Sequence, residues 1–146
     1  MSILQLTSEV YKAIRAHGEE TYPHECCGAL LGSPSEGGWR VVDSVKAGNT
    51  RTDSAHNRYH IAPIELVRIQ RMAREKGLEI AGFYHSHPDH PAAPSQFDRD
   101  HAWPWYSYII VSVMSGKPAE MTSWRLNDDR QAYTQEQIEI RNRAAV

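Results

Sequence analysis

EIAGFYHSHPDHPAAPSQFD, residues 79–98, joins an apolar stretch to a segment rich in histidine and proline. Its first nine residues are mostly apolar and end in His-Ser-His, a pattern that predicts a strand over residues 79–87. Side chains at positions i and i+2 of a strand point to the same face, with Cα atoms about 7 Å apart. His85 and His87 would therefore present two imidazoles that can converge on one divalent ion.

The residues after this strand would bring a third ligand to the same ion. Three prolines stiffen the connection, and a short helix is expected over residues 95–101. Asp98 in that helix would add a carboxylate oxygen to the two imidazoles. Two His ligands, one carboxylate and one open position are typical of a catalytic zinc site rather than a structural one. We therefore expect one Zn²⁺ per chain, held by His85, His87 and Asp98.

Ser95 and Asp98 also form the Ser-x-x-Asp pattern of a helix capping box, in which Ser95 caps the helix. The structural and the metal-binding interpretations are compatible. Capping would fix the helix that presents Asp98, and the remaining carboxylate oxygen would still reach the ion.

A hydrolytic zinc site also needs a general base that takes a proton from water and passes it to the leaving amine. The candidate is Glu25, which directly precedes a short apolar strand expected over residues 26–31. If that strand pairs beside the strand of His85 and His87, Glu25 can face the metal. The sequence alone leaves this pairing open.

Two long helices are expected elsewhere, over residues 6–18 and 63–76, where apolar residues recur at helical spacing. Thr7 is placed to cap the first helix and Gly18 to end it. A proline opens the second helix, where its missing N–H is tolerated, and Gly77 would end it.

Further strands are expected over residues 39–45, 106–114 and 121–126. The tail over residues 133–140 fits either an edge strand or a last helix, and residues 49–60 are expected to form a polar surface loop. Because strands and helices are interspersed, the predicted fold class is α/β or α+β, with a mixed curved sheet flanked by the two long helices.

The bulk properties are those of a globular protein. The 146 residues suit one domain over residues 1–146, and a formal net charge of -2 gives no electrostatic reason to expect nucleic-acid binding. No apolar run approaches the roughly 18 residues of a membrane helix, and the first residues lack a signal-peptide pattern. The two cysteines, Cys26 and Cys27, are adjacent, so no disulfide framework is expected. A cytoplasmic protein is therefore predicted, and a homodimer is compatible with the sequence.

The spacing of these residues resembles the motif of the JAMM (MPN+) zinc metallopeptidases. Glu25 stands before Cys26-Cys27-Gly28, and His85-Ser86-His87-Pro88 is followed by Ser95 and Asp98, so every motif position is filled. The order of the expected elements is similar to that family as well, over residues 5–126. The resemblance implies an MPN domain whose outline is like that of the cytidine deaminases.

The resemblance also implies an activity. Such a protein would cleave a peptide or isopeptide bond after the C-terminal Gly-Gly of a ubiquitin-like protein, with Glu25 as the base and the Ser95 hydroxyl helping to hold the oxyanion. Small stand-alone members are similar to peptidases that process sulfur carriers. Only a short connection that begins at residue 99 separates Asp98 from the next strand, which leaves little room for the insertion that polyubiquitin-cleaving relatives use. The expected substrate is a sulfur-carrier tail lying along a sheet edge, with residues 49–60 ordering over it.

Two other functions are kept open: a general isopeptidase acting on ubiquitin-like conjugates, and a catalytically silent MPN scaffold that only binds partners. The intact ligand set argues against the scaffold. Comparing a linear Gly-Gly-X tail with a lysine-linked conjugate separates the two enzymatic alternatives.

Rival catalytic motifs fail on spacing. His24-Glu25 begins like His-Glu-x-x-His, but the fifth position is Gly28. The Cys-x-x-Cys that a zinc deaminase combines with its His-x-Glu is absent from the sequence. A nucleophilic Cys26 or Cys27 would be poorly placed inside an apolar strand.

Overall fold

Seven strands and two helices are found in residues 2–48, 61–95 and 102–142, the part of the chain that the computed structural model describes. In chain order they are β1 (Ile3–Thr7), α1 (Ser8–Thr21), β2 (Cys27–Ser35), β3 (Gly38–Ala47), α2 (Pro63–Glu75), β4 (Glu79–Pro88), β5 (Ser107–Met114), β6 (Lys117–Leu126) and β7 (Tyr133–Arg141). The α+β class is confirmed. The loop expected over residues 49–60 and the helix expected over residues 95–101 lie outside the described residues, apart from Ser95.

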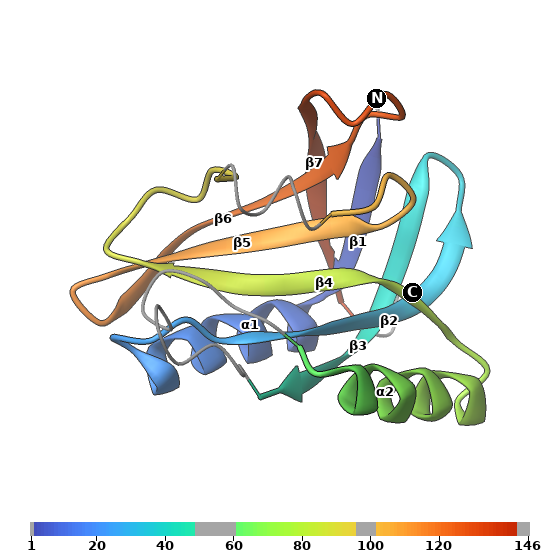
Figure 1. The fold of residues 1–146 in the computed structure, drawn as a ribbon, viewed down its shortest axis with the longest axis horizontal. Helices are drawn as coiled ribbons and strands as arrows, with labels where there is room; N and C mark the ends of the chain where they lie inside the picture. The colour runs from blue at the N-terminus through green and yellow to red at the C-terminus, as the bar shows by residue number, and fades with distance from the viewer. Residues whose placement is uncertain (1, 49–60, 96–101, 143–146) are drawn as a thin grey trace.

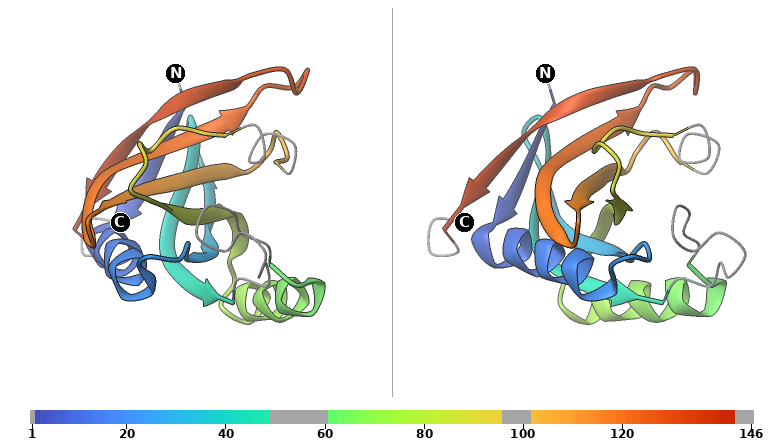
Figure 2. Two further views of the ribbon diagram at one scale, coloured as in Figure 1. Left: turned by 60° about the vertical axis from the view of Figure 1, so that its left-hand side comes forward. Right: turned by 90° about the vertical axis from the view of Figure 1, so that its left-hand side faces the viewer.

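The strands form one closed barrel in the order β1-β3-β2-β4-β5-β6-β7, and β7 pairs again with β1. Three pairings are parallel, β1 with β3, β1 with β7 and β4 with β5, and the others are antiparallel, so the sheet is mixed as predicted. Figures 1 and 2 show β7 and β1 side by side where the sheet closes. Closure was not predicted. It depends on β7, a segment that fitted either a strand or a helix, and on β1, which includes the first residues of the expected first helix.

The first helix differs from its prediction at both ends. Leu6 belongs to β1, and α1 continues past Gly18 to Thr21. The predicted cap is confirmed, since the Thr7 side chain accepts a hydrogen bond from Val10 N at 3.2 Å. Gly18 is buried inside the helix, and a Cβ there would lie 3.0 Å from a Val113 methyl group. This glycine therefore allows close contact between α1 and β5 rather than ending the helix.

The second helix ends where the sequence predicted. Gly77 has φ of 69°, a left-handed conformation that glycine adopts without a Cβ clash. Gly77 N donates to Arg74 O at 3.0 Å, and Leu78 N donates to Ala73 O at 2.8 Å. These two bonds are the Schellman pattern, which satisfies the last carbonyls of α2 before the chain enters β4.

Alternate residues of the sheet pack against the two helices on opposite faces. Val10 and Ile14 of α1 join strand residues from β1 to β5 in one buried cluster, which fills the inside of the barrel. Ile69 and Ala73 of α2 pack with Cys27 and its neighbours in a second cluster on the outer face. Figure 2 shows α2 outside the curved sheet. Neither α1 nor α2, the helices of the described ranges, has the length and hydropathy to cross a bilayer.

Gly82 marks the closest approach between the main chains of β4 and β5. It pairs with Ser107, and a Cβ at Gly82 would overlap the Ser107 carbonyl. Because the obstacle is main chain, we expect Gly82→Ala to destabilise the protein by about 1–3 kcal/mol or more. Urea unfolding measures this loss. Gly48→Ala is the matched control, since a Cβ at Gly48 would meet its nearest neighbour at 3.5 Å. Equal unfolding midpoints for both variants would contradict the packing described for Gly82.

Candidate metal centre

The end of β4 brings two imidazole rings together as the sequence predicted. The Nε2 atoms of His85 and His87 lie 3.1 Å apart, and the ring centroids are 4.9 Å apart. His85 is buried, with 2% of its surface exposed, and His87 is half-buried. Both rings therefore direct the same ring nitrogen toward a common point.

This arrangement fits the ligand chemistry of zinc. Two tetrahedral ligands with Zn–N distances of about 2.0–2.1 Å hold their nitrogens roughly 3.3 Å apart, close to the separation found here. Nδ1 of His87 lies 2.9 Å from Pro91 O. A carbonyl only accepts hydrogen bonds, so this Nδ1 carries the proton and Nε2 keeps its lone pair. His87 is thus held in the tautomer that a metal ligand requires.

The pairing that the sequence left open is present, because β2 lies antiparallel beside β4. Cys27 is opposite His85, Ser86 N donates to Cys26 O at 3.1 Å, and Cys26 N donates to Ser86 Oγ at 2.8 Å. If this register continued two residues beyond Cys27, Glu25 would lie opposite His87, on the face of the sheet that both imidazoles share. Glu25 is buried, with 4% of its surface exposed.

The other two predicted site residues lie beyond β4. Ser95 is exposed at the end of the described connection, and Asp98 lies outside the described residues. Within residues 2–48, 61–95 and 102–142, no three His, Cys, Asp or Glu side chains are grouped closely enough to hold a metal. The structure therefore brings His85 and His87 together, and it tests neither the roles of Glu25 and Ser95 nor the third ligand.

Asp89, which the sequence analysis did not single out, fixes the turn directly after β4. Its φ is 57°, and its N donates to Val113 O at 2.8 Å. Its carboxylate accepts from Tyr22 OH at 2.6 Å and from Ser115 N at 2.7 Å. The hydrogen bond from Tyr22 holds the pKa of the Asp89 carboxyl below its usual value. No sequence signal indicated this role, because the partners are distant along the chain.

The thiols of Cys26 and Cys27, which follow Glu25 in the chain, are poor nucleophiles at neutral pH. Burial raises the pKa of Cys26 to about 11 and the pKa of Cys27 to about 12. Both remain protonated at neutral pH, whereas the thiolate is the nucleophilic form. This agrees with the expectation that a cysteine in this apolar strand is poorly placed as a nucleophile. His24 and His90 are exposed.

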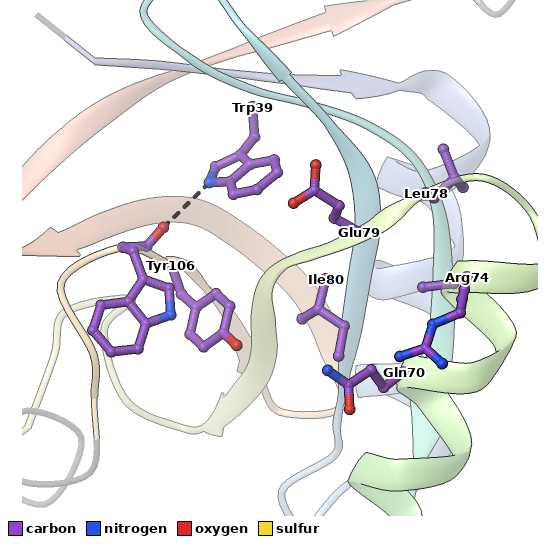
Figure 3. Close-up of a pocket in the computed structure, with 9 residues that line it drawn as sticks. Trp39, Gln70, Arg74, Leu78, Glu79, Ile80 and Tyr106 are labelled. Atoms are coloured by element: carbon purple, nitrogen blue, oxygen red, sulfur yellow. Dashed lines mark hydrogen bonds between the residues drawn. The ribbon is translucent and has the colours of Figure 1, made fainter.

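The aromatic pocket in Figure 3 is a different place from the metal centre. It has a volume of about 550 Å³, and its lining includes Trp39, Arg74, Ile80, Trp105 and Tyr106. Ile80 lies near the start of β4, and the two imidazoles lie near its end. At about 3.3 Å per strand residue, roughly 20 Å separates the two sites. The candidate chemistry therefore does not involve this pocket.

The fold is that of a JAB/MPN-type domain, and comparison with known proteins identifies the family. Residues 7–127 match the prokaryotic homologs of the JAB domain, so the chain belongs to that family. The resemblance inferred from the motif is confirmed. A desampylase of Haloferax volcanii is 33% identical over 116 residues, which cover 76% of this chain and 81% of that protein.

Solved structures agree with this assignment. A protein from Desulfitobacterium hafniense superposes with a TM-score of 0.83 at 27% identity, covering 95% of this chain and 93% of its own. A Salinibacter ruber protein gives 0.74 at 38% identity, with coverages of 95% and 92%. A JAB1/MPN domain protein from Archaeoglobus fulgidus gives 0.60 at 17% identity, with coverages of 97% and 100%, and shows likeness of fold alone.

Proposed function

We propose that this chain is a zinc-dependent peptidase that cleaves the bond after the C-terminal Gly-Gly of a ubiquitin-like protein. The observation that supports this most strongly is the convergence of two imidazole Nε2 atoms, 3.1 Å apart, beside β2, which begins two residues after Glu25. In a member of the JAB family, such a pair beside a buried carboxylate suits metal-assisted hydrolysis.

Metal binding, proton transfer and oxyanion binding would fall to different residues. His85, His87 and Asp98 would hold Zn²⁺, which supplies Lewis acidity toward water and the scissile carbonyl when it is bound. Glu25 would remove the proton of the attacking water and deliver it to the departing amine. The Ser95 hydroxyl would donate a hydrogen bond to the oxyanion.

Access to this site would be across the face of the sheet. β4 is flanked by β2 on one side and β5 on the other, so a substrate tail cannot extend the sheet at β4. The sheet edge expected for the tail would therefore belong to a segment other than β4. His85 shares its face with Cys27, which packs on the α2 side. The tail would therefore approach from the outside of the barrel.

Two kinds of substrate suit this chemistry. The name of the H. volcanii desampylase denotes removal of an attached ubiquitin-like archaeal modifier, which favours an isopeptide bond to lysine. The short connection of eight residues, 99–106, between Asp98 and β5 favours a small carrier, such as a sulfur carrier with a linear tail. Both substrates place the same Gly-Gly carbonyl at the metal and differ only in the amine that leaves.

A direct comparison of the two substrates tests the proposal. Zinc-loaded protein is incubated with a ubiquitin-like protein bearing a linear Gly-Gly-X tail and with the same protein joined to a lysine side chain. Cleavage after Gly-Gly, detected by mass, is expected for at least one of them, and the ratio of kcat/KM identifies the preferred bond. A chain that binds partners without cleaving either substrate would be the catalytically silent scaffold instead.

A further inference from the structure

The connection that follows β4 is attached to the barrel through three consecutive carbonyl groups. His90 O accepts a hydrogen bond from Ser112 Oγ at 2.6 Å, and Ala92 O accepts one from Thr122 Oγ1 at 2.6 Å. The carbonyl between them, that of Pro91, accepts from His87 Nδ1 at 2.9 Å. The donors come from β5, β6 and β4, so one short stretch of backbone is fixed to three strands.

These donors share the face of the sheet that bears the two imidazoles. Ser112 pairs with His87 in the β4–β5 register, and Ile110 pairs with His85. Thr122 pairs with Ile110 on the other side, so Thr122 is in the same row as His85. Opposite residues on neighbouring strands point the same way. The two hydroxyls thus belong to the same surface as the metal centre.

The direction of the bond from Thr122 is fixed by a neighbouring indole. Trp124 Nε1 lies 2.8 Å from Thr122 Oγ1, and an indole N–H can only donate. Thr122 therefore accepts from Trp124 and must use its own proton for Ala92 O. Thr122 and Ser112 are both buried, at 6% and 3% exposure, so losing either hydroxyl leaves a carbonyl of the connection without this donor.

We infer that Ser112 and Thr122 are positioning residues for the metal ligand His87, acting through the carbonyl of Pro91. The inference rests on the proposed function in that His87 is taken as a zinc ligand. By holding the carbonyls on either side, the two hydroxyls set the place of Pro91 O. Pro91 O in turn holds the proton on His87 Nδ1 and leaves Nε2 as the ligand atom. Groups that hydrogen-bond directly to a metal ligand, as Pro91 O does to His87, typically change metal affinity by about 10–100-fold.

The test uses Ser112→Ala, Thr122→Val and the double variant. We expect zinc affinity to fall by about 10-fold or more in the double variant, measured by competition with a chromophoric chelator. In the metal-free protein, ¹⁵N NMR of the imidazoles should show His87 as the Nδ1–H tautomer in wild type and as a mixture of tautomers in the double variant. Placing Ser instead of Val at position 122 returns a hydroxyl to this site. Thr122→Ser should therefore restore the zinc affinity and the Nδ1–H tautomer of His87.

Matched controls separate positioning from general damage. Ser107→Ala removes a buried hydroxyl from β5 on the opposite face, and Thr134→Val removes a hydroxyl from β7 that bonds only toward Asn127 among the described contacts. Neither should change the His87 tautomer. A double variant whose His87 tautomer and zinc affinity equal those of wild type overturns the inference. If the wild type itself binds no zinc, the proposed function fails, and the tautomer measurement still decides this inference.

Discussion

Glu25→Gln is expected to lower kcat by about 10²–10⁴-fold, the usual contribution of a general base, while zinc remains bound. Glutamine keeps the size and one hydrogen-bonding oxygen of glutamate but cannot take up a proton. Glu25 would lie opposite His87 in the β2–β4 register without being counted among the metal ligands, so the metal should be unaffected. Turnover of a Gly-Gly substrate, together with zinc content by mass spectrometry, measures the two effects separately.

Glu136→Gln provides the matched control, because Glu136 is also a buried glutamate, with 2% exposure. It lies on β7, where its carboxylate accepts hydrogen bonds from Ser2 Oγ at 2.5 Å and Ser123 Oγ at 2.7 Å. Neutralising this carboxylate should affect thermal stability and leave kcat at its wild-type value. A fully active Glu25→Gln enzyme would show that another group moves the proton.

Removing one imidazole should abolish stoichiometric zinc and activity together. In His85→Asn, His87 is the one imidazole left of this pair. The two Nε2 atoms that lie 3.1 Å apart in the wild type are no longer both present. A catalytic zinc site depends on about three protein ligands, so losing one is expected to reduce affinity by orders of magnitude. Chelator treatment of the wild type should give the same inactive state, and added zinc should restore activity only to the wild type.

The control for this experiment is His90→Asn, five residues along the chain. The His90 side chain is exposed, and its contact with Ser112 is made by the main-chain carbonyl, which asparagine retains. This variant should bind one zinc ion and cleave substrate at the wild-type rate. Stoichiometric zinc in His85→Asn would exclude His85 from the ligand set and would overturn the proposed metal centre.

The pair His85 and His87 was predictable because it depends on one short strand, whose two-residue period puts both rings on one face. The ends of α2 were also predictable from local sequence, since Pro63 and Gly77 act through their own main-chain geometry. Glu25 could be nominated from its place before an apolar strand, but only the structure shows that this strand, β2, pairs with β4.

The remaining features depend on contacts between segments that are distant in sequence. β1 and β7 are more than 120 residues apart, and each looks ambiguous alone, so closure of the barrel had no local signal. Gly18 was misjudged because a glycine that ends a helix and one that admits a neighbouring strand look the same in sequence. Thr122 and Ser112 are ordinary strand residues until their hydroxyls meet carbonyls 20 to 30 residues earlier.

The placement of both imidazoles on a strand bonded along both sides has an energetic consequence for metal uptake. Chain entropy is lost when a site is ordered, and a ligand that must order its own site binds more weakly by that amount. Here folding of the barrel already fixes the backbone beneath His85 and His87. The histidine half of the centre is therefore preorganised, and capturing the ion requires little rearrangement of the strand that presents it.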